Sequence, residues 1–235
     1  AAVAKQESYM HKPALSGVFA LLSFLLAACL AAEASETAAG ASPTRIVPQT
    51  GLMEAKEDTA ARRAEPMPFY VYNNAIFPPV KNFSPSGYMG DVADLKLSGS
   101  YKNLHQPGSP CLRIMYMAEG HMGWAGVSWQ NPANNWGEFD GGYNLSKAKK
   151  LSFWARGESG GEIMEAKLGG TAANYPDSET LTSGPITLTN VWTEYVLDLS
   201  AADLFYISSG FGLSVKQDAN PKGAIFYIDD VKYDE

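Results

Sequence analysis

Residues 123–142 read GWAGVSWQNPANNWGEFDGG and contain three of the five tryptophans of the chain. Aromatic and β-branched residues dominate 123–130, and no helical period of apolar residues runs through them, so a strand is predicted there. The Asn-Pro and Asn-Asn pairs that follow are typical of turns and end this strand. Trp136 is therefore predicted to lie on a loop that begins after Gln130.

The rings and amides of this segment are the residue types that a sugar-binding surface needs. Ring faces can cover the C–H patches of a pyranose, and amides can donate to and accept from its hydroxyls. The candidates for sugar contact are Trp124, Trp129, Gln130, Asn134, Asn135 and Trp136. The alternative is that the tryptophans are core. Trp124 and Trp129 are an odd number of residues apart, so they point to opposite faces of a regular strand and one of them is expected in the core. For Trp136, burial and exposure both remain open.

Candidate strands recur at fairly regular intervals from Pro66 to the end of the sequence, separated by turn residues. They cover residues 68–73, 94–100, 111–117, 124–130, 150–156, 162–169, 186–189, 193–200, 210–217 and 224–233. No long helical period occurs after Pro66. This pattern predicts one all-β domain over residues 66–235, folded as an antiparallel β-sandwich.

Alternation within these strands predicts which side chains leave the core. We expect one sheet to display a mixed aromatic and charged face, a second candidate surface for sugar binding. Its members are Trp154, Arg156, Glu165, Lys167 and Ser214. The alternative is an ordinary solvated face with charge pairs across strands.

Four segments carry a resemblance to a known fold. They are WAGVSWQ (124–130), GGYNLSKAKKLSFWARGE (141–158), ITLTNVWTEYVLDLSAADL (186–204) and AIFYIDDVKYDE (224–235). Together they resemble the galactose-binding-like jelly roll of many carbohydrate-binding modules. The resemblance covers about the whole of 66–235 and implies non-catalytic binding of a polysaccharide or glycan, although a fold alone does not fix function.

Members of that fold often hold a structural calcium where the first and last strands meet. By resemblance, the matching positions are Asn73, Asn74, Asp229 and Asp230. Calcium takes hard oxygen ligands, and two adjacent Asp residues at a strand end supply them. Amides stand where an acidic ligand from the first strand would be stronger, and a solvated strand end is the alternative. No catalytic cofactor is expected.

The N-terminal part has the pattern of an export signal. From Met10, the expected natural start, a short basic region and an apolar run have signal-peptide length, so residues 1–28 are assigned to it. The run ends Leu26-Ala27-Ala28-Cys29, which resembles the lipobox of bacterial lipoproteins. The resemblance implies cleavage before Cys29 and a lipid on its sulfur. An uncleaved membrane anchor is the alternative.

Residues 29–65 are expected to form the lipidated cysteine and a flexible linker, because they contain no aromatic residue and are rich in Ala, Glu, Thr and Ser. The lipid would hold the protein to a membrane of the cell envelope. In a Gram-negative source this is the outer membrane, since Leu30 rather than Asp follows the cysteine. We expect a monomer.

Charge and motifs argue against several classes of function. The chain has a net charge of −7, and the 12 basic and 18 acidic residues of 66–235 leave −6 on the domain, which disfavours nucleic acid. Motifs of phosphate-binding loops, zinc hydrolases and serine hydrolases are absent. With Cys29 lipidated, Cys111 has no intramolecular partner, and its strand-like context predicts a buried thiol.

Two other functions remain open. A glycoside hydrolase or lyase is one, since a glycosidase places two carboxyl groups across the scissile bond. Glu138 and Asp140 are the best local pair, while Glu119, Glu162, Glu165 and Asp177 can still pair in space. A structural or protein-binding envelope lipoprotein is the other alternative.

Overall fold

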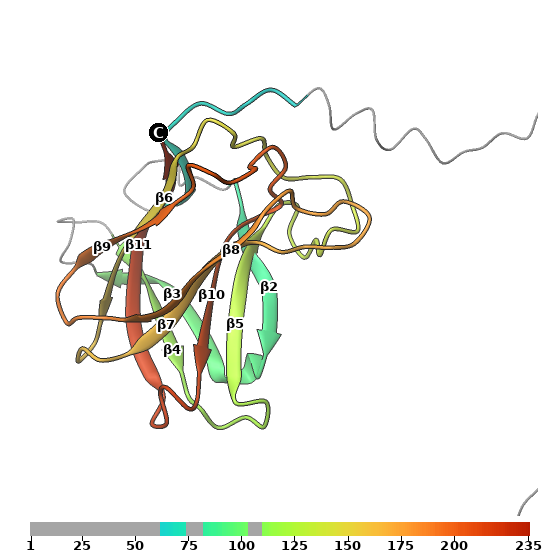
Figure 1. The fold of residues 1–235 in the computed structure, drawn as a ribbon. Coiled ribbons are helices and arrows are strands. Elements are labelled where there is room, and N and C mark those ends of the chain that lie inside the picture. Colours follow the sequence, from blue (N-terminus) through green and yellow to red (C-terminus); the bar gives the residue numbers. More distant parts are fainter. Residues whose placement is uncertain (1–61, 74–81, 103–109) are drawn as a thin grey trace, which may run out of the picture. The chain divides into compact units, whose positions relative to one another are not determined.

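The computed structural model describes residues 62–73, 82–102 and 110–235. The predicted signal peptide, Cys29 and Asn74 lie outside these ranges. Two antiparallel sheets make up the described domain (Figure 1), which confirms the all-β sandwich. Within the described ranges, no helix is long and apolar enough to cross a membrane.

The first sheet, sheet A, has the last strand of the chain at its centre. Its order is β3 (Leu95–Lys102), β4 (Pro110–Tyr116), β11 (Ala224–Asp234), β6 (Lys150–Gly157) and β9 (Thr193–Asp198), and β1 (Phe69–Tyr72) also pairs with β11. The second sheet, sheet B, has the order β2 (Ser84–Gly90), β5 (Trp124–Gln130), β10 (Ser209–Lys216), β7 (Ile163–Gly169) and β8 (Thr180–Thr187). A short 3-10 helix, Val92–Asp94, lies between β2 and β3.

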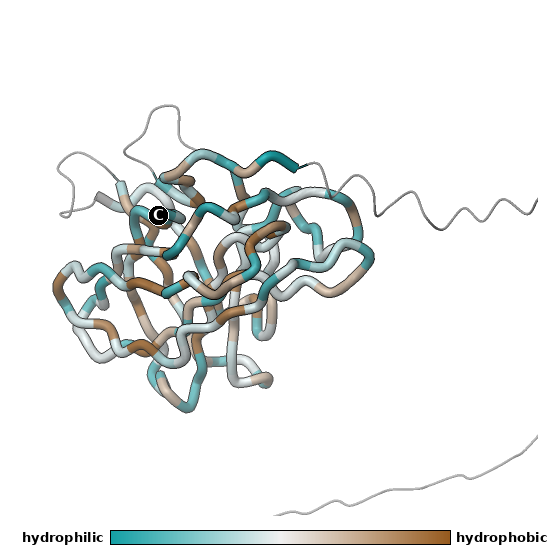
Figure 2. Tube along the Cα trace, turned by 45° about the horizontal axis from the view of Figure 1, so that its top comes forward, coloured by the Kyte–Doolittle hydropathy of each residue, from teal (hydrophilic) through white to brown (hydrophobic). Residues whose placement is uncertain are grey.

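The core lies between the two sheets and follows the predicted alternation. Every second residue of β6, namely Leu151, Phe153 and Ala155, is fully buried. The Phe153 ring of sheet A lies 5.4 Å from the Phe211 ring of sheet B, so the two sheets meet through an aromatic contact. Trp129 of sheet B also lies 5.4 Å from Phe211. In Figure 2 short hydrophobic stretches (brown) alternate with polar ones along the strands. This is the period of strands that bury one face.

Two strands differ from the sequence prediction. Strand β2 (SPSGYMG) was not predicted, because its serines, proline and glycines are typical of turns; it pairs with β5 along its length. Strand β8 covers 180–187 rather than 186–189 and contains a Gly-Pro pair. Its register with β7 shifts between Glu165 and Lys167, so a bulge accommodates those residues. In both strands, pairing with a neighbour overrides local propensity.

The single mixed face predicted from alternation is wrong. Trp154 and Arg156 lie on β6 in sheet A, whereas Glu165, Lys167 and Ser214 lie on β7 and β10 in sheet B. Alternation shows which side of its own strand a residue occupies, but sheet membership depends on pairing between distant segments. The two groups therefore lie on opposite outer faces of the sandwich.

Candidate functional site

The loop after β5 presents two exposed aromatic rings. Trp136 is 41% exposed and Phe139 is 66% exposed. The predicted loop position of Trp136 is therefore confirmed, and its exposure is settled. Phe139 was not singled out in the sequence, although an aromatic residue between Gly137 and Gly142 in a turn-rich run is the signal that could have identified it. We call Trp136, Phe139 and the exposed Asn134 the Trp136 surface.

Asn135 holds this loop in shape from inside. Its side-chain nitrogen donates to the Phe139 carbonyl at 2.7 Å, and its side-chain oxygen accepts from the Phe139 N–H at 3.0 Å. The residue is 1% exposed. Asn135 is therefore not positioned to contact a sugar, which corrects its assignment as a binding residue.

The base of the loop is fixed by further hydrogen bonds. Asn131 accepts from the Gly142 N–H at 3.1 Å and donates to the Asn82 carbonyl at 2.8 Å. Arg62 donates to the Gly142 carbonyl at 3.1 Å and forms an ion pair with Asp140. Arg62, which lies four residues before the predicted boundary at Pro66, thus contacts the domain.

A second loop supports the first from the side. The Tyr175 N–H donates to the Gly137 carbonyl at 2.8 Å, and the two loops lie side by side at one end of sheet B in Figure 1. Asp177 accepts from the backbone N–H groups of Thr171 and Ser208, which ties the second loop to the start of β10. The carboxylate of Asp177 is therefore structural.

Gln130 and Asn134 have different roles. Gln130 is buried, and its side-chain nitrogen has no hydrogen-bond partner among the described residues. Asn134 is exposed, and its backbone N–H donates to the Ser86 hydroxyl at 2.8 Å. Asn134 has a positive φ of 58°, which Asn tolerates better than most residues. Of these two residues, Asn134 is the one exposed to solvent beside Trp136.

The two tryptophans of β5 divide as predicted. Trp129 is 1% exposed and belongs to the core. Trp124 is half-buried and lies on the outer face of sheet B, since Ala125 and Val127 face inward. Trp124 and the loop carrying Trp136 are at opposite ends of a strand about 20 Å long. They are therefore not adjacent rings of one stacking surface.

The remaining binding candidates lie on strand faces. Glu165 forms an ion pair with Lys216 at 2.8 Å on sheet B, and the bond to Glu165 raises the pKa of Lys216. Trp154 and Arg156 are half-buried on sheet A. The structure does not bring these three residues to the Trp136 surface.

The predicted calcium ligands are partly brought together. The side-chain nitrogen of Asn73 donates to the carboxylate of Asp230, and Asp229 is buried beside them. The Asn73 side chain thus directs its N–H donor, and not its oxygen, toward the Asp230 carboxylate. No cluster of three His, Cys, Asp or Glu side chains suited to a metal occurs in the part of the chain that the structure describes. Calcium binding stays a prediction.

The carboxylates proposed for catalysis are distributed over the domain. Glu119 and Glu162 line one open cleft of about 400 Å³ together with Glu158. Asp140 is bound by Arg62, and Glu138 is exposed on the Trp136 loop. Of the four carboxylates that the sequence left open for pairing, Glu119 and Glu162 thus line the same cleft.

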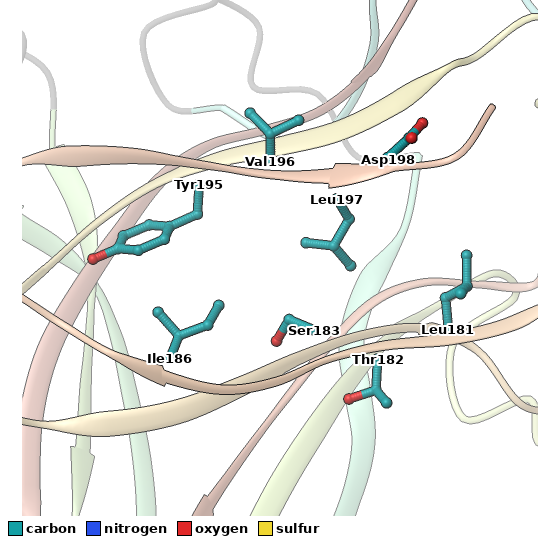
Figure 3. Close-up of a pocket in the computed structure, with 8 residues that line it drawn as sticks. All are labelled: Leu181, Thr182, Ser183, Ile186, Tyr195, Val196, Leu197 and Asp198. Atoms are coloured by element: carbon teal, nitrogen blue, oxygen red, sulfur yellow. The ribbon is translucent and has the colours of Figure 1, made fainter.

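Another cleft, of about 350 Å³, separates the edge strands β8 and β9. Figure 3 shows Leu181 and Ile186 facing Leu197 and Tyr195 across it. The Tyr195 ring stacks on Phe153 at 5.6 Å, and the Ser183 hydroxyl accepts from the Ala166 N–H. Because its aromatic ring and hydroxyl already serve the fold, this cleft is a weaker match for a sugar than the Trp136 surface.

Comparison with known proteins identifies the fold. No family model matches the chain, and no curated protein does. Among solved structures, a family 30 carbohydrate-binding module matches with a TM-score of 0.52 and 14% identity, over 72% of this chain and 87% of its own. The family 30 module of a cellulosomal cellulase of Clostridium thermocellum matches with a TM-score of 0.51 and 14% identity, over 72% of this chain and 97% of its own. The described domain therefore has the jelly-roll sandwich fold of these carbohydrate-binding modules.

Proposed function

We propose that the domain binds a polysaccharide without catalysis, through the Trp136 surface. The observation that carries the proposal is an exposed indole on a loop that hydrogen bonds hold at both ends. Most tryptophans bury their rings, so an exposed one on a rigid support is a candidate contact for a ligand. The fold shared with carbohydrate-binding modules supports the same reading.

The chemistry of the surface suits a neutral sugar. Sugars offer few charges, so affinity comes from covering C–H faces with rings, and orientation comes from hydroxyl hydrogen bonds. Trp136 and Phe139 provide the rings, and the exposed amide of Asn134 can donate and accept. A loop that hydrogen bonds already hold in one shape loses less conformational entropy when a ligand binds.

Trp136→Ala tests the proposal. Stacking of an aromatic ring contributes about 1–3 kcal/mol by analogy with nucleobases, so the variant should lose most detectable binding. Binding is measured by affinity electrophoresis in gels that contain β-glucan, xylan or mannan. Met122→Ala is the control. Met122 is 62% exposed and precedes β5, whereas Trp136 follows the other end of this strand. Equal binding by Trp136→Ala and the unmodified protein would refute the Trp136 surface as the site.

One observation favours a second function. Glu119, Glu158 and Glu162 line the same cleft, so a hydrolase or lyase that uses this carboxylate group is the alternative. Such an enzyme would release reducing ends or unsaturated sugars from a polysaccharide, and Glu162→Gln would abolish their release.

A protein-binding envelope lipoprotein would instead bind no glycan and would retain an envelope protein in a pull-down.

We also propose that Cys29 carries lipid and anchors the protein to the cell envelope. The support is the Leu26-Ala27-Ala28-Cys29 sequence at the end of an apolar run of signal length. Cys29→Ser should move the protein out of the membrane fraction. If the variant stays membrane-bound at its full precursor mass, the segment is an uncleaved anchor and the lipid assignment fails.

A further inference from the structure

The outer face of sheet A carries an unusual arrangement of charge. Arg113 and Arg156 are the only arginines in residues 66–235. They lie on β4 and β6, which flank β11, and both are in register with Tyr227. The residues next to them in sequence, Ile114, Ala155 and Phe226, belong to the core and face inward. Because successive side chains of a strand alternate, Arg113, Arg156 and Tyr227 face outward. We call Arg113, Tyr227 and Arg156 the arginine row.

Aromatic rings hold the two guanidinium groups in place. Arg156 lies over the Tyr227 ring at 5.1 Å, and Arg113 lies over the Tyr101 ring at 5.9 Å. Tyr101 itself packs on Tyr227 with the ring centres 4.9 Å apart. Tyr227 is therefore covered, while Tyr101 remains 46% exposed. The result is an open tyrosine ring beside two oriented guanidinium groups.

The guanidinium groups keep hydrogen-bonding capacity. Arg113 forms no ion pair with any residue of the described ranges, and the Nε atom of Arg156 is buried and has no hydrogen-bond partner there. The nearest carboxylate, Glu158, is 3.8 Å from Arg156, beyond hydrogen-bond distance, and accepts instead from the Tyr227 hydroxyl at 2.5 Å. Within the described ranges Glu158 is the one carboxylate within 4.0 Å of either guanidinium group, and the buried Asp229 lies further along β11 on the same face.

We propose that the arginine row binds the carboxylate of a uronic acid residue in an acidic glycan, with the sugar ring against Tyr101. Guanidinium is planar and matches a carboxylate with two parallel N–H donors. The ring of Tyr101 is open to the C–H face of the same sugar. The inference rests on the proposed function in taking the ligand to be a glycan, and it adds a site for acidic residues that is separate from the Trp136 surface.

The test compares three polymers with the full chain at one fixed salt concentration: polygalacturonate, which carries carboxylates, dextran sulfate, and unmodified dextran. Polygalacturonate should bind, and Arg113→Gln should weaken it about tenfold, the effect of losing one hydrogen-bonded charged partner. Arg113→Lys keeps the charge but loses the two parallel N–H donors of the guanidinium group, so it should also weaken polygalacturonate binding. Lys96→Gln removes an exposed charge of β3 on the same sheet and should have little effect.

Several outcomes would overturn the proposal. These are no binding of polygalacturonate, an equal loss in Lys96→Gln, full binding by Arg113→Lys, or tighter binding of dextran sulfate than of polygalacturonate. Tyr101→Ala gives an independent check that leaves both arginines in place, and it too should weaken binding. Melting curves of each variant show whether lost binding reflects lost folding.

The two proposals can fail separately. Trp136→Ala should leave polygalacturonate binding unchanged if the arginine row holds the acid. If Trp136→Ala has no effect on any polymer while Arg113→Gln still weakens polygalacturonate, the Trp136 surface fails and the arginine row stands. If neutral polymers bind through Trp136 and polygalacturonate does not bind, the arginine row fails alone.

Discussion

The segment 123–142 contains two regions that solve different physical problems. In its strand half, Trp129 is enclosed between the sheets at 1% exposure, and its position follows from alternation. In its loop half, Trp136 lies seven residues later at 41% exposure, on backbone that no ladder supports. In the loop, side-chain hydrogen bonds from Asn131 and Asn135 hold the backbone instead of pairing with a neighbouring strand. The comparison shows that the same residue type stabilises the fold in one half and is left exposed in the other.

Among the variants that test this comparison, Trp129→Ala should cause the largest loss in the free energy of unfolding. Removing the ring leaves a cavity against Phe211, and large-to-small aromatic changes in a core cost about 3–5 kcal/mol. Urea unfolding measures the loss. Trp136→Ala in the same assay should change the free energy of unfolding by less than about 0.5 kcal/mol. A similar loss in both variants would show that Trp136 is a core residue.

Asn135→Ala should have a smaller effect, confined to the loop half. The substitution removes the two part-buried hydrogen bonds to the N–H and carbonyl of Phe139, and a typical hydrogen bond contributes about 0.5–1.5 kcal/mol. Glycan binding should fall as well, since the loop would lose its shape. Asn134→Gly is the matched control for stability alone, because it removes the neighbouring exposed amide and still allows the positive φ. Met122→Ala is the control for binding. If Asn135→Ala keeps both stability and binding, the loop does not depend on this side chain.

Arg62→Ala tests the outermost support of the loop. Its ion pair with Asp140 and its contact with the Tyr206 ring at 5.1 Å are partly exposed, so the expected loss is about 1 kcal/mol. The adjacent Arg63 is exposed and forms no ion pair within the described ranges, so Arg63→Ala should be neutral. Added salt should reduce the difference between the two variants. A salt-independent difference would assign the effect to packing on Tyr206 instead.

The sequence predicted the strand half better than the loop half. Alternation placed Trp129 or Trp124 in the core and predicted the outward-facing residues Trp154 and Arg156 of β6 and Ser214 of β10, because strand periodicity is local. It could not give sheet membership, so Trp154 and Glu165 were grouped although they lie on opposite faces. Nor could it show that Asn135 turns inward while Asn134 turns outward. That difference depends on hydrogen bonds to Phe139 and Ser86, and adjacent residues of one type carry no signal for it.

The reactivity of the Cys111 thiol can measure the smallest of the expected effects on stability. Burial, followed by the charge of Asp229, raises the pKa of this thiol from 9.0 to about 11. Because the unfolded chain ionises at the lower pH, the native state loses stability as pH rises from about 9 through 11. At pH 8 little thiolate exists, and the side chain is 1% exposed, so the folded protein should react very slowly with a thiol reagent.

The labelling rate of Cys111 then separates the two tryptophans without any ligand. A Cys29→Ser background leaves Cys111 as the only cysteine of the chain. In this background, Trp129→Ala should accelerate labelling, because weakening the core raises the population of open states in which the thiol reacts. Trp136→Ala should leave the rate unchanged within error, since the loop contributes nothing to the burial of β4. Faster labelling in Trp136→Ala would mean that the loop and the core unfold together, and the division between the two halves of 123–142 would then fail.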